Sequence, residues 1–166
     1  MKYVAQFEKV SYDQFREDII KLTDIDTKFI PYHYEEVKLP TRGSKGSAGY
    51  DFVIPYAVII QPGESKIIPT GIRCKIDDSW MLSLYPRSGL GFKTHVRLAN
   101  SVGIIDSDYY YTDNEGHIMV KLVAADKSIE LNCGDRFCQG VFTEYGITVD
   151  DECEAERTGG FGSTGA

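Results

Sequence analysis

Short runs rich in Val, Ile, Tyr and Phe, separated by clusters of Gly, Pro, Asp and Asn, fill the chain from about Tyr34 onward. β-branched and aromatic residues favour strands, and the separating residues favour turns. Ile72, Cys74 and Ile76 alternate with basic residues, which predicts a strand with one buried face. Similar short runs cover residues 80–85, 117–124 and 137–145. Because no helical pattern separates these runs, the sequence predicts an all-β sandwich, jelly roll or barrel rather than a parallel α/β fold.

The two ends of the chain differ from this β pattern. Residues 11–22 are expected to form a helix, because Phe15 and Ile19 recur at a helical interval and Ser11 and Gln14 have capping-box spacing. Residues 157–166 are too rich in glycine to form a helix or a central strand unaided, so we expect a mobile arm. The predicted parts are an N-terminal extension with one helix packed on the core (1–34), a β domain (35–156) and the arm (157–166).

Composition narrows the class of protein. The 166 residues suit one ordinary domain. The formal net charge of -7 argues against a nucleic-acid binder, which grips phosphates through clustered Lys and Arg. No stretch approaches the ~18 apolar residues of a membrane span, and no signal peptide is evident, so we expect a cytoplasmic protein without a membrane partner. The cysteines lack zinc-site spacing, which indicates free, reduced thiols: Cys74, Cys133, Cys138 and Cys153.

Four stretches combine glycine with charged or hydroxyl residues, a mixture suited to a backbone that approaches an anion. Residues 47–51 could equally be a strand entry. In residues 86–91, Arg87, Ser88 and the amide of Gly89 could donate hydrogen bonds to phosphate oxygens, although a plain turn with a surface arginine fits as well. Each stretch taken alone leaves both readings open.

The other two stretches add a carboxylate and aromatic rings. In residues 103–109, Asp106 could activate water while Tyr109 packs against a ligand ring; the alternative is a turn capped by aspartate side chains. The arm places one aromatic ring, Phe161, among glycines and near Arg157. A disordered tail would not require that ring.

Taken together and in order, these stretches resemble the five motifs of the trimeric dUTPase family, over the chain from about Lys38 to the C-terminus. The first motif is similar to residues 47–51, the second to 86–91, the third to 103–109, the fourth to 134–139 and the fifth to 157–165. The resemblance implies a jelly-roll-like subunit, a homotrimer with shared active sites, and an arm that closes over a neighbouring site. It implies hydrolysis of dUTP to dUMP and pyrophosphate, which limits uracil incorporation into DNA and supplies dUMP for thymidylate synthesis.

The resemblance also implies roles for individual residues. Asp106 would be the general base that activates the attacking water, and Tyr109 would stack under the deoxyribose and exclude a 2′-hydroxyl. Asn100 and the backbone of Gly103 and Ile105 would read uracil, on which Phe161 would stack. The phosphate contacts would come from Arg87, Ser88, Gly89, Gln139, Arg157, Gly162, Ser163 and Thr164. Mg²⁺ would be held mainly by the triphosphate, with Asp51 as an outer-shell partner.

Three departures from the family pattern stand out. Residues 110–115 interrupt the usual run of the third motif from Tyr109 to Gly116, which we interpret as a surface-loop insertion. Cys138 stands where alanine is common, as a small residue that should keep the strand. The N-terminal extension has no counterpart in shorter members, and its partner stays open.

Two alternatives compete with dUTP hydrolysis. The related dCTP deaminase shares the fold, but it needs a catalytic glutamate on the strand after the third motif, where this chain carries Lys121. A nucleotide-dependent regulatory protein would use the same fold with catalysis secondary, and its distinguishing segments would be the N-terminal helix and the insertion.

Overall fold

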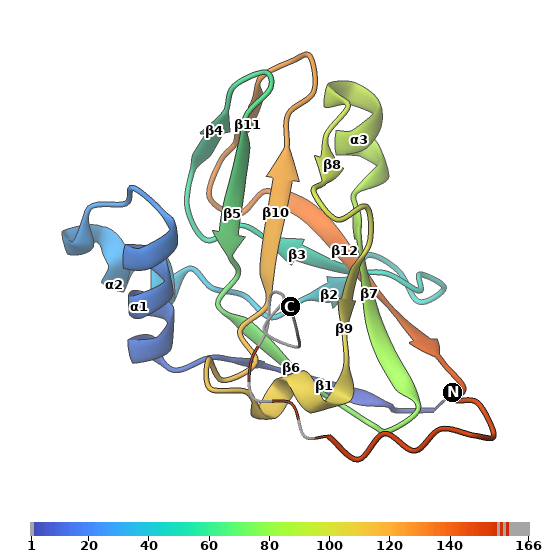
Figure 1. The fold of residues 1–166 in the computed structure, drawn as a ribbon. Coiled ribbons are helices and arrows are strands. Elements are labelled where there is room, and N and C mark those ends of the chain that lie inside the picture. The colour runs from blue at the N-terminus through green and yellow to red at the C-terminus, as the bar shows by residue number, and fades with distance from the viewer. Residues whose placement is uncertain (1, 156, 158, 160–166) are drawn as a thin grey trace.

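Antiparallel strands make up most of the regular secondary structure in this computed structural model, which describes residues 2–155, 157 and 159 (Figure 1). The strands are β1 (Ala5–Lys9), β2 (Thr41–Arg42), β3 (Tyr50–Val53), β4 (Val58–Ile60), β5 (Ser65–Pro69), β6 (Ile72–Ile76), β7 (Trp80–Pro86), β8 (Arg97–Leu98), β9 (Gly103–Ile105), β10 (Met119–Val123), β11 (Ile129–Leu131) and β12 (Arg136–Glu144). The helices are α1 (Tyr12–Leu22), η1 (Thr27–Phe29), α2 (Ile30–Glu35), α3 (Ser88–Thr94) and η2 (Ser107–Tyr111). The predicted jelly-roll-like all-β class is confirmed.

A five-stranded sheet with the order β2-β3-β12-β7-β9 brings distant parts of the sequence together. The central strand, β12, pairs with β3 on one side and with β7 on the other, and β7 pairs in turn with β9. Residues 47–51, 134–139, 86–91 and 103–109 adjoin β3, β12, β7 and β9 respectively. The pairing sets residues 47–51 and 134–139 beside the start of residues 86–91, whereas residues 106–109 follow β9 toward the other end of β7, since Ile105 lies opposite Leu82. A register shift between Arg136 and Cys138 bends β12 at its start.

Alternating burial along the strands builds one apolar core. In β6, Ile72, Cys74 and Ile76 are buried as predicted, while Lys75 is exposed. Phe52 of β3 and Leu82 of β7 face the same core. Strands β5, β10 and β8 form a second sheet, and β11 pairs with β4. The core thus lies between sheets whose inner faces carry Ile, Leu, Val and Phe.

The N-terminal extension is built into this core rather than attached to its surface. Strand β1 pairs along its whole length with β6, from Ala5 opposite Ile76 to Lys9 opposite Ile72. Helix α1 lies beside β5 and buries Phe15 and Ile19 completely (Figure 1). The predicted helix over 11–22 is confirmed, but the expectation of a single helix was incomplete, because β1, η1 and α2 also belong to the extension.

The cap of α1 joins the helix to the insertion after Tyr109. Ser11 accepts a hydrogen bond from the Gln14 backbone amide at 3.1 Å, as the capping-box spacing predicts. The other half of the box is absent: the amide and hydroxyl of Ser11 donate to the Glu115 carboxylate at 2.8 and 2.6 Å. Glu115, far along the chain, therefore takes the place of the Gln14 side chain as the acceptor for the Ser11 amide.

The helical segments inside the β region correct the expectation that no helix separates the strands. Residues 88–94 form α3 directly after β7, with Arg87 at the N-cap and none of its residues buried. Residues 107–111 form the short helix η2. The predicted strand over 117–124 begins only at Met119, since His117 turns inward toward α1.

The insertion after Tyr109 is also more ordered than a surface loop. Thr112 is only 4% exposed. Tyr110 donates its hydroxyl to Glu8 at 2.7 Å, and the Arg73 guanidinium lies 3.6 Å from the centre of the Tyr110 ring. Tyr111 stays exposed. The segment is therefore anchored on β1 and β6.

The Glu115 contacts predict a pH-dependent contribution to stability. Partial burial alone would raise the pKa of Glu115, but hydrogen bonds from Ser11 and the charge of Arg73 lower it overall. A carboxyl with a depressed folded pKa stabilises the fold above its unfolded pKa, near 4.5, and loses this contribution as the pH falls through the folded value. Glu115→Gln should lower the free energy of unfolding at neutral pH by on the order of 1 kcal/mol, and the difference from wild type should shrink in acid. Urea unfolding at several pH values measures the free energy of unfolding, with Glu17→Gln at an exposed position as control. A difference between wild type and Glu115→Gln that stays constant with pH would contradict the prediction.

Candidate functional site

A polar cavity of about 360 Å³ lies where β3, β12 and the end of β7 meet. Its lining combines two guanidinium groups, one carboxylate, two hydroxyls and an amide, with glycines between them: Gly43, Ser47, Ala48, Gly49, Asp51, Arg87, Ser88, Arg136 and Gln139. Guanidinium, hydroxyl and amide donors that converge on one cavity suit an anion with several oxygens. The four predicted residues Asp51, Arg87, Ser88 and Gln139 therefore share one pocket.

Asp51 holds the two arginines of this cavity in place. Its carboxylate oxygens lie 3.0 Å from Arg87 Nε and 3.1 Å from Arg136 Nη1. The Asp51 side chain is 13% exposed, so the pair with Arg87 is partly shielded from water. Two cations against one anion leave an excess positive charge in an acidic chain, which favours a bound anion there.

The close approach of β3 and β12 explains the glycine at position 49. Gln139 lies opposite Asp51 in the register of these strands. A Cβ atom added to Gly49 would lie 2.6 Å from Oε1 of Gln139. Glycine therefore leaves the Gln139 amide room to face the cavity.

A second cavity, of about 250 Å³, lies beside β9. Its lining is mostly apolar with one side-chain amide and one ammonium group: Leu84, Leu98, Ala99, Asn100, Gly103, Met119, Val120 and Lys121. The tight turn after Asn100 places Ser101 at a φ of 63°, a left-handed conformation that costs energy in a residue with a side chain. An apolar slot with one amide suits a flat, polar-edged ring, so Asn100 and Gly103 lie where a base could be read.

Strand β9 leads from this cavity to Asp106 and Tyr109. Among the described residues, Asp106 occupies the N-cap position of η2 without a side-chain hydrogen bond to the helix, and 45% of its side chain is exposed. The alternative of an aspartate-capped turn is thus not supported at this position. Tyr109, in contrast, is only 5% exposed. One carboxylate is available for chemistry next to one fixed aromatic ring.

Arg157 lies against its own chain's Asp106. Its Nη1 atom is 2.8 Å from Asp106 Oδ2 and 3.1 Å from Asp108 Oδ1, and its guanidinium carbon is 5.3 Å from the centre of the Tyr109 ring. Partial burial alone would lower the pKa of Arg157, but the hydrogen bonds with both aspartates raise it overall. The guanidinium therefore stays charged and screens the carboxylate of Asp106.

The predicted site residues that the structure brings together thus form three groups: those of the Arg87 cavity, those of the Asn100 cavity, and the cluster of Asp106, Tyr109 and Arg157. The cavity of Arg87 and the cavity of Asn100 have no lining residue in common among the residues that the structure describes. Gly89 lies in α3 with open space around it, and Ile105 is half-buried in β9. Phe161, Gly162, Ser163 and Thr164 lie outside the described residues.

Two functional candidates escaped sequence reasoning. Arg136 lies within the fourth motif, and its charge next to Gln139 was a signal that could have singled it out. Asn114 donates its side-chain amide to the Tyr109 hydroxyl at 3.0 Å. No sequence pattern marks Asn114, because it lies inside the insertion.

The His, Cys, Asp and Glu side chains are the protein's candidate metal ligands and redox groups. No cluster of three or more His, Cys, Asp or Glu side chains in residues 2–155, 157 and 159 could hold a metal ion. All four cysteines are free, as predicted. Cys138 is fully buried in β12, and burial raises the pKa of its thiol, so it acts as a small apolar residue. No helix in the described part of the chain has the length and apolar character to cross a bilayer.

Gly49→Ala tests whether the polar cavity binds phosphate groups. The added Cβ would push the Gln139 amide out of its place, so the affinity for inorganic pyrophosphate should fall about tenfold. Because only the end of a flexible side chain has to move, the melting temperature should change little. Isothermal titration calorimetry measures the affinity. Gly46→Ala is the matched control, since no described atom lies within 4 Å of a Cβ built there. Equal affinities of the two variants would contradict a role for Gln139.

Comparison with known proteins matches this geometry to one family. The family model described as dUTPase matches residues 35–165. The deoxyuridine 5'-triphosphate nucleotidohydrolase of Lactococcus lactis is 41% identical over 139 residues, which are 81% of this chain and 93% of the relative. The enzyme of the same name from Photorhabdus laumondii is 38% identical over 151 residues, 85% of this chain and 96% of the relative.

Solved structures give the same result. The dUTPase of Streptococcus mutans superposes with a TM-score of 0.64 at 31% identity, covering 86% of this chain and 97% of that one. A mutant dUTPase from phage phi11 of S. aureus, described with a structural Mg(II) ion, has a TM-score of 0.64 at 19% identity and covers 92% and 98%; this likeness concerns the fold alone. The family model and the relatives together show that this chain belongs to the dUTPase family.

Proposed function

We propose that this chain hydrolyses dUTP to dUMP and pyrophosphate, the activity in the name of its relatives, by attack of water on the α-phosphorus. The observation that carries the proposal is the carboxylate of Asp106. It lies at the end of β9, half exposed and not used to cap η2. A solvent-accessible carboxylate that can accept a proton from water is what this reaction needs.

Asp106 acts as the general base in this proposal. Its Oδ2 atom accepts a hydrogen bond from Arg157 in the structure, so the attacking water would bind where that guanidinium now contacts the carboxylate. When the triphosphate arrives, Arg157 exchanges Asp106 for phosphate oxygens and leaves the base free. A hydrogen bond of ordinary length between Asp106 and the water is then sufficient for proton transfer.

The cavity beside β9 receives the nucleoside. Asn100 and the backbone of Gly103 and Ile105 read the edge of uracil, and Tyr109 packs under the deoxyribose. The apolar walls of this cavity leave few polar groups to satisfy a 2′-hydroxyl. Lys121 lines the same cavity, where a dCTP deaminase would need a glutamate to move protons, so the cavity favours the uracil nucleotide.

The polar cavity receives the phosphates. Arg87, Ser88, Gly89 and Gln139 donate hydrogen bonds there, and Arg136 joins them. Asp51 is held by two arginines, so its carboxylate fits an outer-shell contact rather than direct coordination. Mg²⁺, bound mainly through the triphosphate, would neutralise phosphate charge and polarise the α-phosphorus.

A homotrimer with shared sites would let different subunits contribute the two cavities to one active site. Within one chain, the described residues of the nucleoside cavity and of the phosphate cavity share no member. This division of the lining residues supports a site built from more than one subunit. The arm, with Phe161 for uracil and Gly162, Ser163 and Thr164 for the phosphates, would close over such a site and expel water.

Two cellular consequences follow from this reaction. Removal of the substrate dUTP limits uracil incorporation into DNA, and the product dUMP feeds thymidylate synthesis. We place the enzyme in the cytoplasm.

Asp106→Asn tests the base directly. The amide cannot accept the proton of water, so kcat should fall about a hundredfold or more while dUTP still binds. Pyrophosphate release measures turnover, and calorimetry with dUTP measures binding. Asp78→Asn, in the exposed turn after β6, is the control. Unchanged pyrophosphate release by Asp106→Asn would refute the mechanism.

A further inference from the structure

The hydroxyl of Tyr109 is held by two partners. It donates to the backbone carbonyl of His117 at 2.8 Å and accepts from the Asn114 side-chain amide at 3.0 Å. Burial raises the pKa of this hydroxyl, so it stays protonated and keeps its role as a donor. Two hydrogen bonds at the tip of a buried ring fix the plane of that ring.

Asn114 belongs to the insertion, and another residue of the insertion, Thr112, holds its side chain in place. Its Oδ1 atom lies 2.8 Å from the Thr112 hydroxyl, which leaves the NH₂ group to face Tyr109. Its backbone carbonyl accepts from the His117 amide at 3.0 Å and closes the turn. The insertion thus supplies a direct contact to the tyrosine that precedes it.

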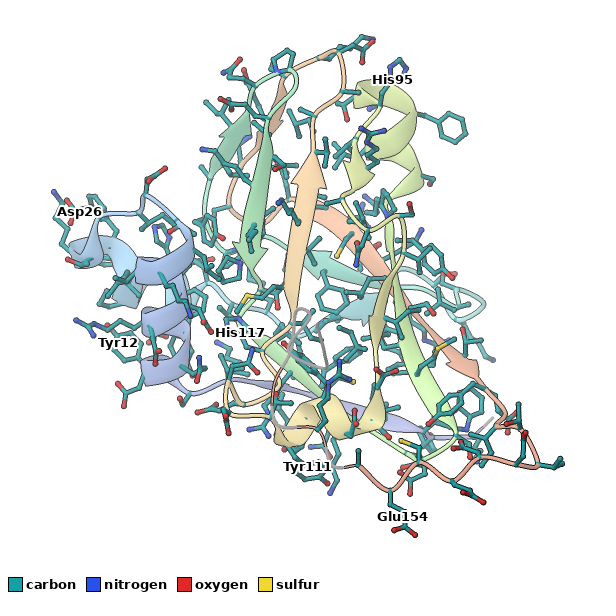
Figure 2. All side chains as sticks on the ribbon, in the orientation of Figure 1. Tyr12, Asp26, His95, Tyr111, His117 and Glu154 are labelled. Atoms are coloured by element: carbon teal, nitrogen blue, oxygen red, sulfur yellow. The ribbon has the colours of Figure 1, made fainter. Side chains whose placement is uncertain are left out.

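His117 is fixed by the N-terminal helix. Its ring is fully buried, and its Nε2 atom accepts from the Gly71 amide at 2.7 Å, so the proton must lie on Nδ1. Nδ1 donates to Asp18 of α1 at 2.6 Å, and the same carboxylate oxygen accepts from Gln14 at 2.8 Å. Figure 2 shows His117 where α1 approaches the start of β10.

Stability alone does not explain why the Asp18 carboxylate is buried. Asp18 is 7% exposed, and a buried ionic or charged hydrogen-bonded pair often stabilises a fold no better than apolar residues of the same size. What such a pair does well is hold an imidazole in one tautomer and orientation. Here the fixed imidazole holds residue 117 in place, and the backbone carbonyl of His117 accepts the hydrogen bond from the Tyr109 hydroxyl.

From these contacts we infer that Asp18 and Asn114 are positioning residues for the sugar selectivity of the enzyme. The N-terminal helix and the insertion meet at the Tyr109 hydroxyl, and together they set the distance between its ring and the sugar. The inference rests on the proposed function, in which Tyr109 excludes the 2′-hydroxyl. Loss of either contact should therefore admit UTP rather than only lower the stability.

The test is the ratio of kcat/KM for dUTP to that for UTP, measured well below the melting temperature. Asn114→Asp keeps the size but removes the donor to Tyr109, and Asp18→Ala removes the acceptor of His117. Each should reduce the ratio about tenfold, because a small displacement of a positioned group costs much of its effect. Asp18→Asn can keep both hydrogen bonds through its carbonyl oxygen and should keep the ratio within about twofold of wild type.

Two exposed carboxylates serve as matched controls: Asp113→Ala beside Asn114, and Glu17→Ala beside Asp18. Neither should change the ratio. If Asp18→Ala does not fold, Asn114→Asp still decides. Tyr109→Ala separates the two proposals: a collapsed ratio in Tyr109→Ala with unchanged ratios in Asn114→Asp and Asp18→Ala overturns the positioning role alone. An unchanged ratio in Tyr109→Ala overturns the sugar role of Tyr109, and the positioning role with it.

Discussion

The pairing of β12 with both β3 and β7 is the constraint on which the site depends. This strand sets Gln139 opposite Asp51 on one side and opposite Tyr85 on the other. Because side chains alternate along β12 beyond the register shift at its start, a slip of one residue would turn Gln139 into the core and the buried Cys138 toward the cavity. Burial of Cys138 therefore fixes the register of Gln139 beside it.

An acidic chain binds a polyanion here by local arrangement rather than by net charge. The formal charge of the whole chain is -7, yet Arg87 and Arg136 share one aspartate at the polar cavity. Beyond the end of β9, Arg157 pairs with the carboxylates of Asp106 and Asp108. Short-range pairing of this kind holds both arginines and aspartates in place until a charged ligand competes for them.

The sequence predicted the strands with alternating burial and the N-terminal helix, because local propensity carries that information. The family resemblance singled out Asp51, Arg87, Ser88 and Gln139, but only the structure shows that they line one cavity. Sequence reasoning missed α3, since Gly89 and Gly91 disfavour a helix and no residue of α3 is buried to mark an apolar face. It also missed the contact between Asp18 and His117, which are distant in sequence and carry no shared pattern. The sequence indicates a surface loop for the insertion after Tyr109, because its anchors, Glu8 and Arg73, lie on other strands.

Hydrolysis of dUTP between the α- and β-phosphates, at a site that rejects other bases and sugars, can be tested with a panel of nucleotides. Turnover of dUTP, UTP, dTTP and dCTP is measured with magnesium, and pyrophosphate and ammonia are scored separately. We expect pyrophosphate from dUTP far faster than from the other three nucleotides, and no ammonia. Ammonia from dCTP, or equal release of pyrophosphate from dUTP and UTP, would contradict it.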